Sequence, residues 1–289
     1  MRFAFIEAEK AHFPVSRMCL LLAVSRAGFY AWRVRPESEH DRKDRKLTVL
    51  VRESHERSRK TYGSPRVHAD LQAQGPVSRK RVARLMQQAG IRGKSRRRYK
   101  GTTNSDHKMP VAPNLLDRKF EAERPNQRWV ADTTELATPG GKLYLAVVID
   151  LFSRFVVGWA LSGINDRHLT LRALDAALRL RCPDDQLLHH SDRGCTYASA
   201  DYQAVLERAG IAASMSRRGN CYDNAAMESW NSTLKCELGE FFDSRADAQA
   251  KLFDYIEVFY NQQRRHSTLD YLCPAAFERA AEMRLGPAA

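Results

Sequence analysis

The sequence predicts an α/β protein in which a mixed sheet flanked by helices follows small all-helical domains. Three observations indicate this fold class: the first 100 residues contain only helical patterns, β-rich runs begin after Gln127, and helical and strand patterns alternate from about residue 168 onward. With 289 residues, 43% of them hydrophobic, the chain is long enough for two or three domains and at least one large core.

Two short helical patterns lie near the amino terminus, in "PVSRMCLLLAVSRAGFYAWR". They are separated at Ala23–Ser25, and Ser25 is placed to cap the second helix. This is the outline of a helix-turn-helix, although two short helices and a tight turn also occur in bundles that do not bind DNA. The charged residues 36–46 are expected to form a connector.

A second pair of helices is predicted in "SPRVHADLQAQG" and "PVSRKRVARLMQQAG", where Ser78 is a good N-cap and Gly90 a good stop. Four cations lie in the first turn and a half of the second helix, where they oppose the helix dipole. That placement is unfavourable for folding but suits a recognition helix whose first residues enter a DNA groove. We therefore predict DNA contacts by Arg79, Lys80, Arg81 and Arg84.

The segment "RGKSRRRYK" at 92–100 holds six basic residues in nine. It is either a solvated linker or an arm that contacts phosphates, and the basic helix before it favours the arm. The residues of this arm that we predict to contact DNA are Arg96, Arg97 and Arg98. Residues 101–125 are polar and contain three prolines, as expected of an interdomain linker.

Three β-rich runs follow, "QRWVADTTEL", "KLYLAVVIDLF" and "RFVVGWALS", and their short connections indicate an antiparallel meander. A helix at about 168–181, a strand "QLLHHSD", a helix at about 199–209 and a short strand "IAASMS" come next. The last helix of this region lies in "GNCYDNAAMESWNSTLKCEL". Its apolar stripe is bordered on one side by four polar residues, Asn224, Glu228, Asn231 and Lys235.

Positive charge is concentrated in the first part of the chain. Residues 1–125 hold 29 Lys and Arg against 13 Asp and Glu, whereas residues 126–289 hold 18 against 21. A generally basic protein would have its excess of positive charge spread evenly along the chain. The net charge of +13 and the pI near 9.7 favour a polyanionic partner, and its uneven distribution indicates nucleic acid bound by the first part.

Several classes of protein are disfavoured by the sequence. Glu7 and Glu9 interrupt any export signal, and no segment approaches the roughly 20 apolar residues of a membrane helix, so we expect a cytoplasmic protein with no membrane partner. The cysteines show no C-x-x-C pair or His/Cys cluster, which argues against a disulfide framework or structural zinc; they are Cys19, Cys182, Cys195, Cys221, Cys236 and Cys273.

Three acids could converge where strands end. Asp132 lies in the first strand, Asp192 closes the fourth, and Glu228 borders the stripe of the last helix. Clustered carboxylates repel one another unless cations are present, and hard oxygen ligands suit Mg²⁺ or Mn²⁺. Two such ions about 4 Å apart can support phosphodiester displacement. Asp150, at the end of the second strand, and Asp223, a possible helix cap, are competing candidates that acidity and spacing do not exclude.

The local context of these acids distinguishes them. The blocks "WVADTTEL", "HHSDRGCTY" and "SRRGNCYDNAAMESWNSTLKCEL" closely resemble the signature blocks of the bacterial insertion-sequence transposases of the IS-three family, relatives of retroviral integrases. Thirty-five residues separate Asp192 from Glu228, and Lys235 follows Glu228 by seven places, as in that family. The segments "YGSPRVHADL" and "YNQQRRHSTLDYLCPAAF" extend the resemblance over most of the chain, from about residue 14 to residue 277.

The resemblance implies a ribonuclease-H-like core that cuts and joins DNA strands at the ends of a mobile element. It implies Asp132, Asp192 and Glu228 as ligands of two Mg²⁺ or Mn²⁺ ions and Lys235 beside the bound phosphate. The implied partner is double-stranded DNA, bound by a homo-oligomer associated with the nucleoid. The chain resembles the family's second-frame product, so the upstream-frame product or a fusion is a further expected partner. The alternatives are a catalytically idle DNA-binding regulator and a ribonuclease-H-like nuclease.

Other polar residues leave two interpretations open. Arg264 and Arg265 either bind phosphate or form the exposed face of a helix, and His189 and His190 either support a ligand or are buried and satisfied. The expected organisation is a helix-turn-helix-like segment at 1–40, a second helix-turn-helix DNA-binding domain with its basic arm at 41–100, a linker at 101–125, the integrase-like core at 126–240 and a helical extension at 241–289.

Overall fold

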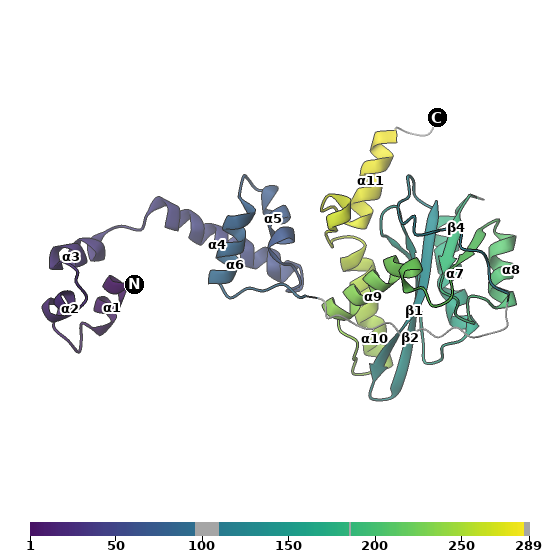
Figure 1. Cartoon of the computed structure of the whole chain (residues 1–289), viewed down its shortest axis with the longest axis horizontal. Helices are drawn as coiled ribbons and strands as arrows, with labels where there is room; N and C mark the ends of the chain where they lie inside the picture. Colours follow the sequence, from purple (N-terminus) through teal and green to yellow (C-terminus); the bar gives the residue numbers. More distant parts are fainter. Residues whose placement is uncertain (96–109, 185, 286–289) are drawn as a thin grey trace.

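The computed structural model of the chain describes residues 1–95, 110–184 and 186–285, apart from the side chains of Cys221 and Leu285. Small groups of helices lie at the amino-terminal end, and a helix-covered sheet lies at the other (Figure 1). The predicted DNA contacts Arg96, Arg97 and Arg98, and residues 101–109 of the predicted linker, lie outside the described residues.

The first group consists of three short helices, α1 (Arg2–Glu9), α2 (Val15–Leu21) and α3 (Arg26–Val34). Ser25 caps α3 as predicted, because its Oγ accepts a hydrogen bond from the Gly28 N–H at 2.9 Å. A small apolar cluster that includes Ile6, Met18 and Phe29 holds the three helices together. The predicted pair of helices is thus confirmed, and α1 is an addition to it.

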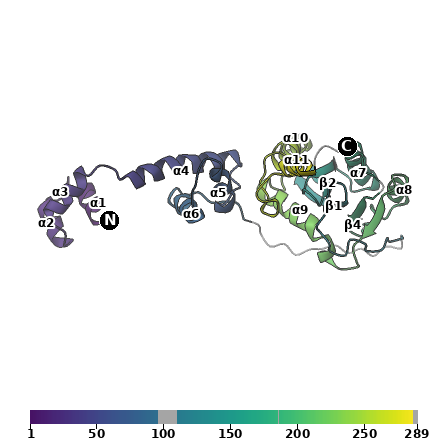
Figure 2. The same cartoon turned by 90° about the horizontal axis from the view of Figure 1, so that it is seen from above.

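The second group contains α4 (Glu39–Arg57), α5 (Ser64–Gln72) and α6 (Arg79–Gln88) (Figure 2). The prediction that residues 36–46 form a connector is wrong, because most of them belong to α4. Ser38 caps this helix through the N–H of Asp41, and Glu39 pairs with Lys43 one turn later. The cap and this ion pair stabilise a helix in a strongly charged stretch.

The core is a five-stranded sheet of order β3-β2-β1-β4-β5. Its strands are β1 (Arg128–Thr138), β2 (Gly141–Asp150), β3 (Val156–Ser162), β4 (Leu188–Ser191) and β5 (Ala212–Met215). The first three form the predicted antiparallel meander, whereas β4 pairs in parallel with β1 and with β5. The predicted mixed sheet is therefore confirmed.

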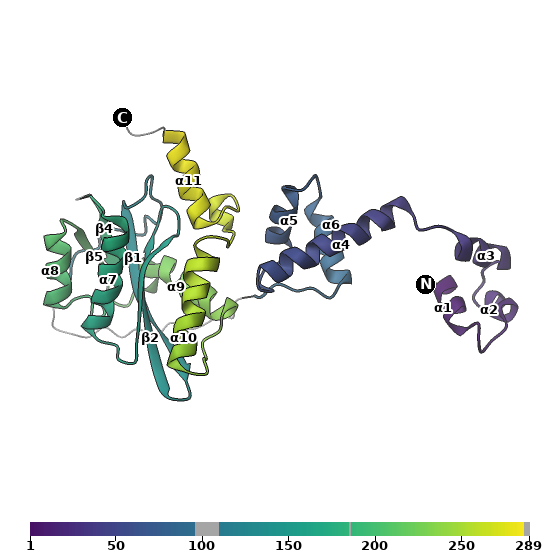
Figure 3. The ribbon, with the colours of Figure 1, turned by 180° about the vertical axis from the view of Figure 1, so that it is seen from behind.

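Helices cover both faces of the sheet (Figure 3). On one face, α7 (Arg167–Arg181) and α8 (Ala200–Arg208) pack over a cluster that contains Trp129 and Ala131. A Cβ at Gly158 of β3 would lie 2.3 Å from the carbonyl oxygen of Ala173, so only glycine lets α7 come this close.

On the other face, α9 (Ala225–Glu237) packs over a cluster that contains Val130 of β1; a 3₁₀ turn at Cys221–Asn224 precedes the helix. Beside it lies α10 (Arg245–Phe253), which continues as a π-helical segment, Asp254–Tyr260.

The carboxyl-terminal segment joins the core to the second helical group. After the π-helical segment come a 3₁₀ turn (Ser267–Leu269) and α11 (Pro274–Leu285). The rings of Tyr62 and Phe259 lie 6.5 Å apart, and the Tyr62 hydroxyl accepts a hydrogen bond from the Arg265 N–H at 2.7 Å. The helix-turn-helix-like group and the core therefore share one continuous apolar cluster.

None of the helices in the described part of the chain combines the length and the hydropathy that a membrane crossing requires. Among the residues with described side chains, the free cysteines are Cys19, Cys182, Cys195, Cys236 and Cys273.

Candidate active site

Asp132 and Asp192 lie side by side because of the register between β1 and β4. Val130 pairs with His190 and Ala131 with Ser191, so the residue after the last pair is an aspartate on both segments, within β1 at Asp132 and directly after β4 at Asp192. Neighbouring strands are about 4.8 Å apart, which places the two carboxylates on one face of the sheet within direct electrostatic range.

The surroundings of Asp132 disfavour its ionised form. Burial, and then the negative charges of Asp192 and Glu228, raise the pKa of Asp132 to about 8. Hydrogen bonds from the Thr133 N–H and from Asn231 Nδ2, both 2.9 Å long, oppose this shift. Asn231, which the sequence places beside Glu228, thus contacts an acid from another element directly.

Asp192 is held in a tight turn after β4. Its Oδ1 accepts a hydrogen bond from the Gly194 N–H at 2.8 Å, consistent with the chain reversal expected there. Tyr197, in the same turn, is buried, and its hydroxyl lies 3.2 Å from Thr133 Oγ1. Tyr197 therefore links this turn to the strand of Asp132, a role the sequence analysis missed because a tyrosine five residues after an acid has no distinctive pattern.

Glu228 lies on α9, close enough for its charge to act on Asp132. Met227, Trp230 and Leu234 form the buried stripe of this helix, as predicted, and Glu228 lies exposed at its border. Partial burial raises the pKa of Glu228, and its charge is felt at Asp132. Among the described residues, however, no three His, Cys, Asp or Glu side chains come close enough to enclose a metal ion.

Asp150, the first competing acid, is used within the fold. Its carboxylate accepts hydrogen bonds from the N–H groups of Asn126 at 2.7 Å and Phe152 at 2.9 Å. Burial raises its pKa to about 6. Two backbone donors therefore give Asp150 a structural role at the end of β2.

Asp223, the second competitor, is not a helix cap. Its buried carboxylate binds the side chains of Arg217 at 2.8 Å and Arg118 at 2.9 Å, and that of Asn114 at 2.9 Å. The hydrogen bonds from Arg217, more than offsetting the effect of burial, hold the pKa of Asp223 well below its usual range. Asp223 thus joins the segment before β1 to the turn that leads into α9.

We predict that Asp223→Asn lowers the free energy of unfolding by about 2 kcal/mol near neutral pH, because charged hydrogen bonds are lost. A folded-state pKa below the unfolded one gives stability that is present above about pH 4 and is lost as the pH falls through the folded value. The difference in the free energy of unfolding between wild type and Asp223→Asn should therefore become smaller at acidic pH. Urea unfolding across this range measures it, and Asp117→Asn, at an exposed partner of Arg217, is the control. A pH-independent difference would contradict this account.

The histidines before Asp192 are buried and hydrogen-bonded. His189 Nε2 lies 3.0 Å from the Tyr202 hydroxyl, and His190 Nδ1 lies 2.8 Å from Ser214 Oγ. Burial lowers their pKa values, to about 3 for His189 and about 4 for His190, so both rings are neutral at physiological pH. The structure favours the satisfied, structural interpretation.

Comparison with known proteins places this geometry in a family. The family described as "Integrase core domain" matches residues 122–221, a second of the same description matches 209–274, and "HTH-like domain" matches 41–99. "Transposase InsF for insertion sequence IS3A" of Escherichia coli (strain K12) is 42% identical over 283 residues, which cover 96% of this chain and 98% of that protein. The chain belongs to the IS3 family of insertion-sequence transposases.

A second relative and one solved structure are also similar to the chain. "Insertion element IS600 uncharacterized 31 kDa protein" of Shigella sonnei is 45% identical to this IS3-family chain over 263 residues, 90% of the chain and 97% of that protein. Among solved structures, a simian T-cell lymphotropic virus intasome in complex with PP2A regulatory subunit B56 gamma aligns with a TM-score of 0.48 and 18% identity, covering 76% of this chain and 73% of that one.

Lys235 lies on α9 two turns after Glu228, as the spacing predicts. It is half-buried, and its Nζ lies 3.5 Å from a carboxylate oxygen of Glu240. The cation is therefore held near the carboxyl end of α9, where a charge of this sign is favourable.

The four cations of α6 divide into two pairs. Arg79 and Lys80 are exposed, as DNA contacts must be. Arg81 and Arg84 bind Asp44 of α4 at 2.7 and 2.5 Å, and these bonds lower the pKa of Asp44. Asp44 thus offsets part of the dipole penalty expected from the sequence, and in this IS3-family chain Arg81 and Arg84 also join α6 to α4, while their groove contact stays a prediction.

Arg264 and Arg265, for which DNA contact stays a prediction, also make bonds within the fold. Arg264 is 3% exposed, and its guanidinium binds Glu237 at 2.6 and 2.7 Å. Arg265 binds Asp70 of α5 and donates to the Tyr271 carbonyl at 2.8 Å. The exposed helix face expected at these positions is instead part of the junction between α5, α9 and the carboxyl-terminal segment.

Proposed function

We propose that this IS3-family chain cuts DNA at the ends of an insertion sequence and joins the cut ends to target DNA, with Asp132, Asp192 and Glu228 as its catalytic acids. The observation that supports this most directly is the β1/β4 register, which sets Asp192 beside Asp132. The charge of Glu228, more than 30 residues farther along the chain, acts on Asp132 as well.

The residue types around these acids fit a divalent cation. The amide oxygens of Asn224 and Asn231 are buried without a donor among the described residues. With the carboxylates of Asp132 and Asp192 they form a set of hard oxygen donors, the kind that Mg²⁺ and Mn²⁺ prefer. We propose that Asp132, Asp192 and Glu228 would hold two such ions. When bound, the ions would supply charge stabilisation at the phosphodiester and an activated attacking oxygen.

The remaining residues would position DNA and the acids. Exposed Arg79 and Lys80 on α6 would contact phosphates, so binding should weaken steeply with salt. Asn231 holds Asp132 through its Nδ2 group, and Thr133 and Tyr197 connect β1 to the turn of Asp192. Lys235, on the same edge of α9 as Glu228, would face the DNA backbone next to the acids.

The products formed from labelled DNA test this proposal. The substrates are duplexes carrying the terminal sequences that flank the gene, incubated with the purified chain and Mg²⁺ or Mn²⁺. Joined strands are the expected product. Binding with no cleavage would instead favour a catalytically idle regulator, and hydrolysis of hybrids without joining would favour a ribonuclease-H-like nuclease.

A further inference from the structure

A second feature of the core, separate from the acids, is a cavity of about 450 Å³ between α5, α9, the sheet and the carboxyl-terminal segment. Its volume is in the range of about 300–1,000 Å³ that ligand pockets occupy. Ala226 and Thr233 line it, and at about 100° per residue they lie on the face of α9 opposite Glu228 and Asn231. The cavity and the acids thus use opposite sides of one helix.

The cavity is cationic. Its lining includes Arg66, Arg154, Arg264 and His266 and, among the residues the structure describes, no carboxylate. Glu237, just outside, lies 2.6 Å from Arg264 and 3.7 Å from Arg66, so one acid serves two guanidinium groups. Arg154 donates to the backbone carbonyl of Phe120 at 3.2 Å. Asp150 and Glu121 lie near Arg154 and favour its cationic form, so Arg66 and Arg264, which share the carboxylate of Glu237, are the less compensated pair.

Although burial opposes it, the hydrogen bonds from Arg264 to Glu237 raise the pKa of Arg264, whereas the pKa values of Arg66 and Arg154 shift the other way. Burial, and then the charge of Arg264, lower the pKa of Arg66, and burial lowers the pKa of Arg154. Both shifts mean that the cationic forms are less favourable here than in water. A bound anion would reverse that effect.

Trp230 provides an independent indication of a ligand. Its side chain lines the cavity and is 4% exposed, and its indole N–H has no acceptor among the described residues. The ring packs edge-on against Tyr260 at a centroid distance of 5.9 Å. Buried tryptophans usually donate this hydrogen to a partner, so an unpaired N–H at a cavity wall indicates that the acceptor belongs to a molecule bound there.

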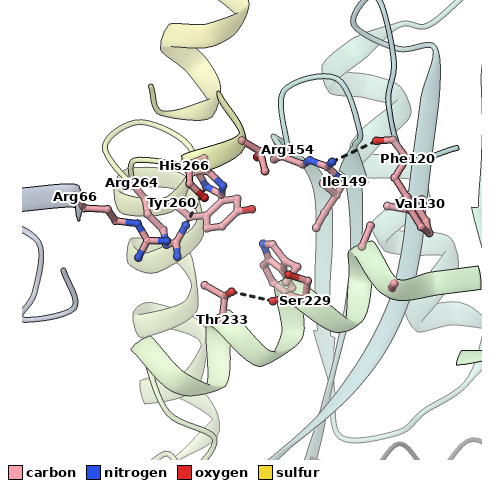
Figure 4. A pocket seen from close by; sticks show the side chains of 15 residues that line it. Arg66, Phe120, Val130, Ile149, Arg154, Ser229, Thr233, Tyr260, Arg264 and His266 are labelled. Atoms are coloured by element: carbon pink, nitrogen blue, oxygen red, sulfur yellow. Dashed lines mark hydrogen bonds between the residues drawn. The ribbon is translucent and has the colours of Figure 1, made fainter. Parts of the chain in front are cut away.

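Charged groups line the cavity at both sides, since Arg154 lies beside Ile149, across from Arg66 and Arg264. Figure 4 shows Arg66, Arg264 and His266 gathered on one side, with Val130 and Ile149 on the opposite side. An occupant that fits both sides carries an anionic group and a compact apolar or aromatic body. Phosphate suits paired guanidinium groups, and a nucleobase suits walls that include Trp230 and Tyr260.

We propose that this cavity binds a nucleoside monophosphate group, with its phosphate toward Arg66 and Arg264 and an acceptor for the Trp230 N–H. The group could be a free nucleotide or an unpaired nucleotide of DNA, because both present the same chemistry. The site is independent of the catalytic assignment of the acids. Since Arg66 belongs to α5, an occupant would also link the helix-turn-helix-like group to α9.

Binding of 2′-deoxyadenosine 5′-monophosphate to the full chain tests the proposal by calorimetry and thermal unfolding. Wild type should bind this nucleotide and unfold at a higher temperature in its presence. Trp230→Phe removes the N–H together with part of the indole ring and should weaken binding about tenfold. The smaller ring also costs packing in the core, so the Tm of each free variant is measured separately and only the nucleotide-induced rise in Tm is compared. Arg66→Gln, at one of the two proposed phosphate contacts, should weaken binding as well. Arg124→Gln, at an arginine paired with Asp184 outside the cavity, should bind as wild type does.

A second binding experiment distinguishes a free nucleotide from an unpaired nucleotide of DNA. A duplex with one extrahelical adenine that binds more tightly than the fully paired duplex, in wild type but not in Trp230→Phe, would identify DNA as the source. A Trp230 effect confined to the free nucleotide would identify a soluble ligand. Absence of binding at millimolar nucleotide, equal affinity of wild type and Trp230→Phe, or equal binding of inorganic phosphate alone would overturn the proposal.

Discussion

Replacement of Asp132 by Asn is expected to reduce DNA cleavage and joining roughly 10³-fold or more, and Asp192→Asn and Glu228→Gln should do the same. Loss of an outer partner of a metal ligand alone costs about 10–100-fold, and each of these changes removes a carboxylate that we assign directly to the ions. DNA affinity should change little, because the exposed cations Arg79 and Lys80 lie on α6, away from the acids. Strand joining and fluorescence anisotropy on the same labelled duplex measure the two effects.

A matched control lies on the same strand as Asp132. Glu135 of β1 is half-exposed and pairs with Lys142 at 3.0 Å, so Glu135→Gln should keep full activity. The Tm of Asp132→Asn should not fall below that of wild type, because burial raises the pKa of Asp132 and its ionised form is unfavourable in the fold. Joining by any one acid variant at wild-type rate would remove that residue from the site.

Replacement of Glu237 by Gln is expected to lower the free energy of unfolding by about 3–5 kcal/mol, the cost of removing one partner of a buried ion pair. The side chains of Glu237 and Arg264 are 6% and 3% exposed, and Tyr255 donates to the same carboxylate at 2.8 Å. Although burial raises the pKa of Glu237, its bonds with Arg264 hold that pKa below the usual value. Urea unfolding followed by circular dichroism measures the loss.

Two further variants show whether the lost stability comes from leaving Arg264 without its partner Glu237. Glu240→Gln, at a half-exposed acid near Lys235, should change stability by less than about 1 kcal/mol. The double change Glu237→Met with Arg264→Met should recover much of the lost stability, because a buried pair can be replaced by apolar groups of similar volume. A single Glu237→Gln variant as stable as wild type would show that Arg264 does not depend on this carboxylate.

Local sequence patterns predicted most of the secondary structure. Ser25 and Ser78 cap the helices they were expected to cap, since a cap depends on residues within one turn. The meander was predictable because short turns join β-rich runs in sequence order. The charges of residues 36–46 favour a connector, whereas the Ser38 cap and the Glu39–Lys43 pair stabilise a helix there.

The site required more than local pattern. The acids Asp132, Asp192 and Glu228 were selected through family resemblance, since acidity alone left Asp150 and Asp223 in competition. The structure gives each competing acid a role within the fold. Backbone N–H groups bind Asp150, and arginine side chains bind Asp223. The sequence does not show which cations of α6 pair with an acid and which are exposed, because the acid, Asp44, lies 37 residues before Arg81.

The sequence by itself determined the order of helices and strands, the basic amino-terminal part and the acids available for chemistry, because composition and periodicity are local properties of the chain. The parallel pairing of β4 with β1, which sets Asp192 beside Asp132, became known only from the folded chain. The same holds for the burial of Arg264 against Glu237 and for the cationic cavity behind the helix of Glu228. These features depend on contacts between distant segments, and such contacts form only when the whole apolar core is buried together.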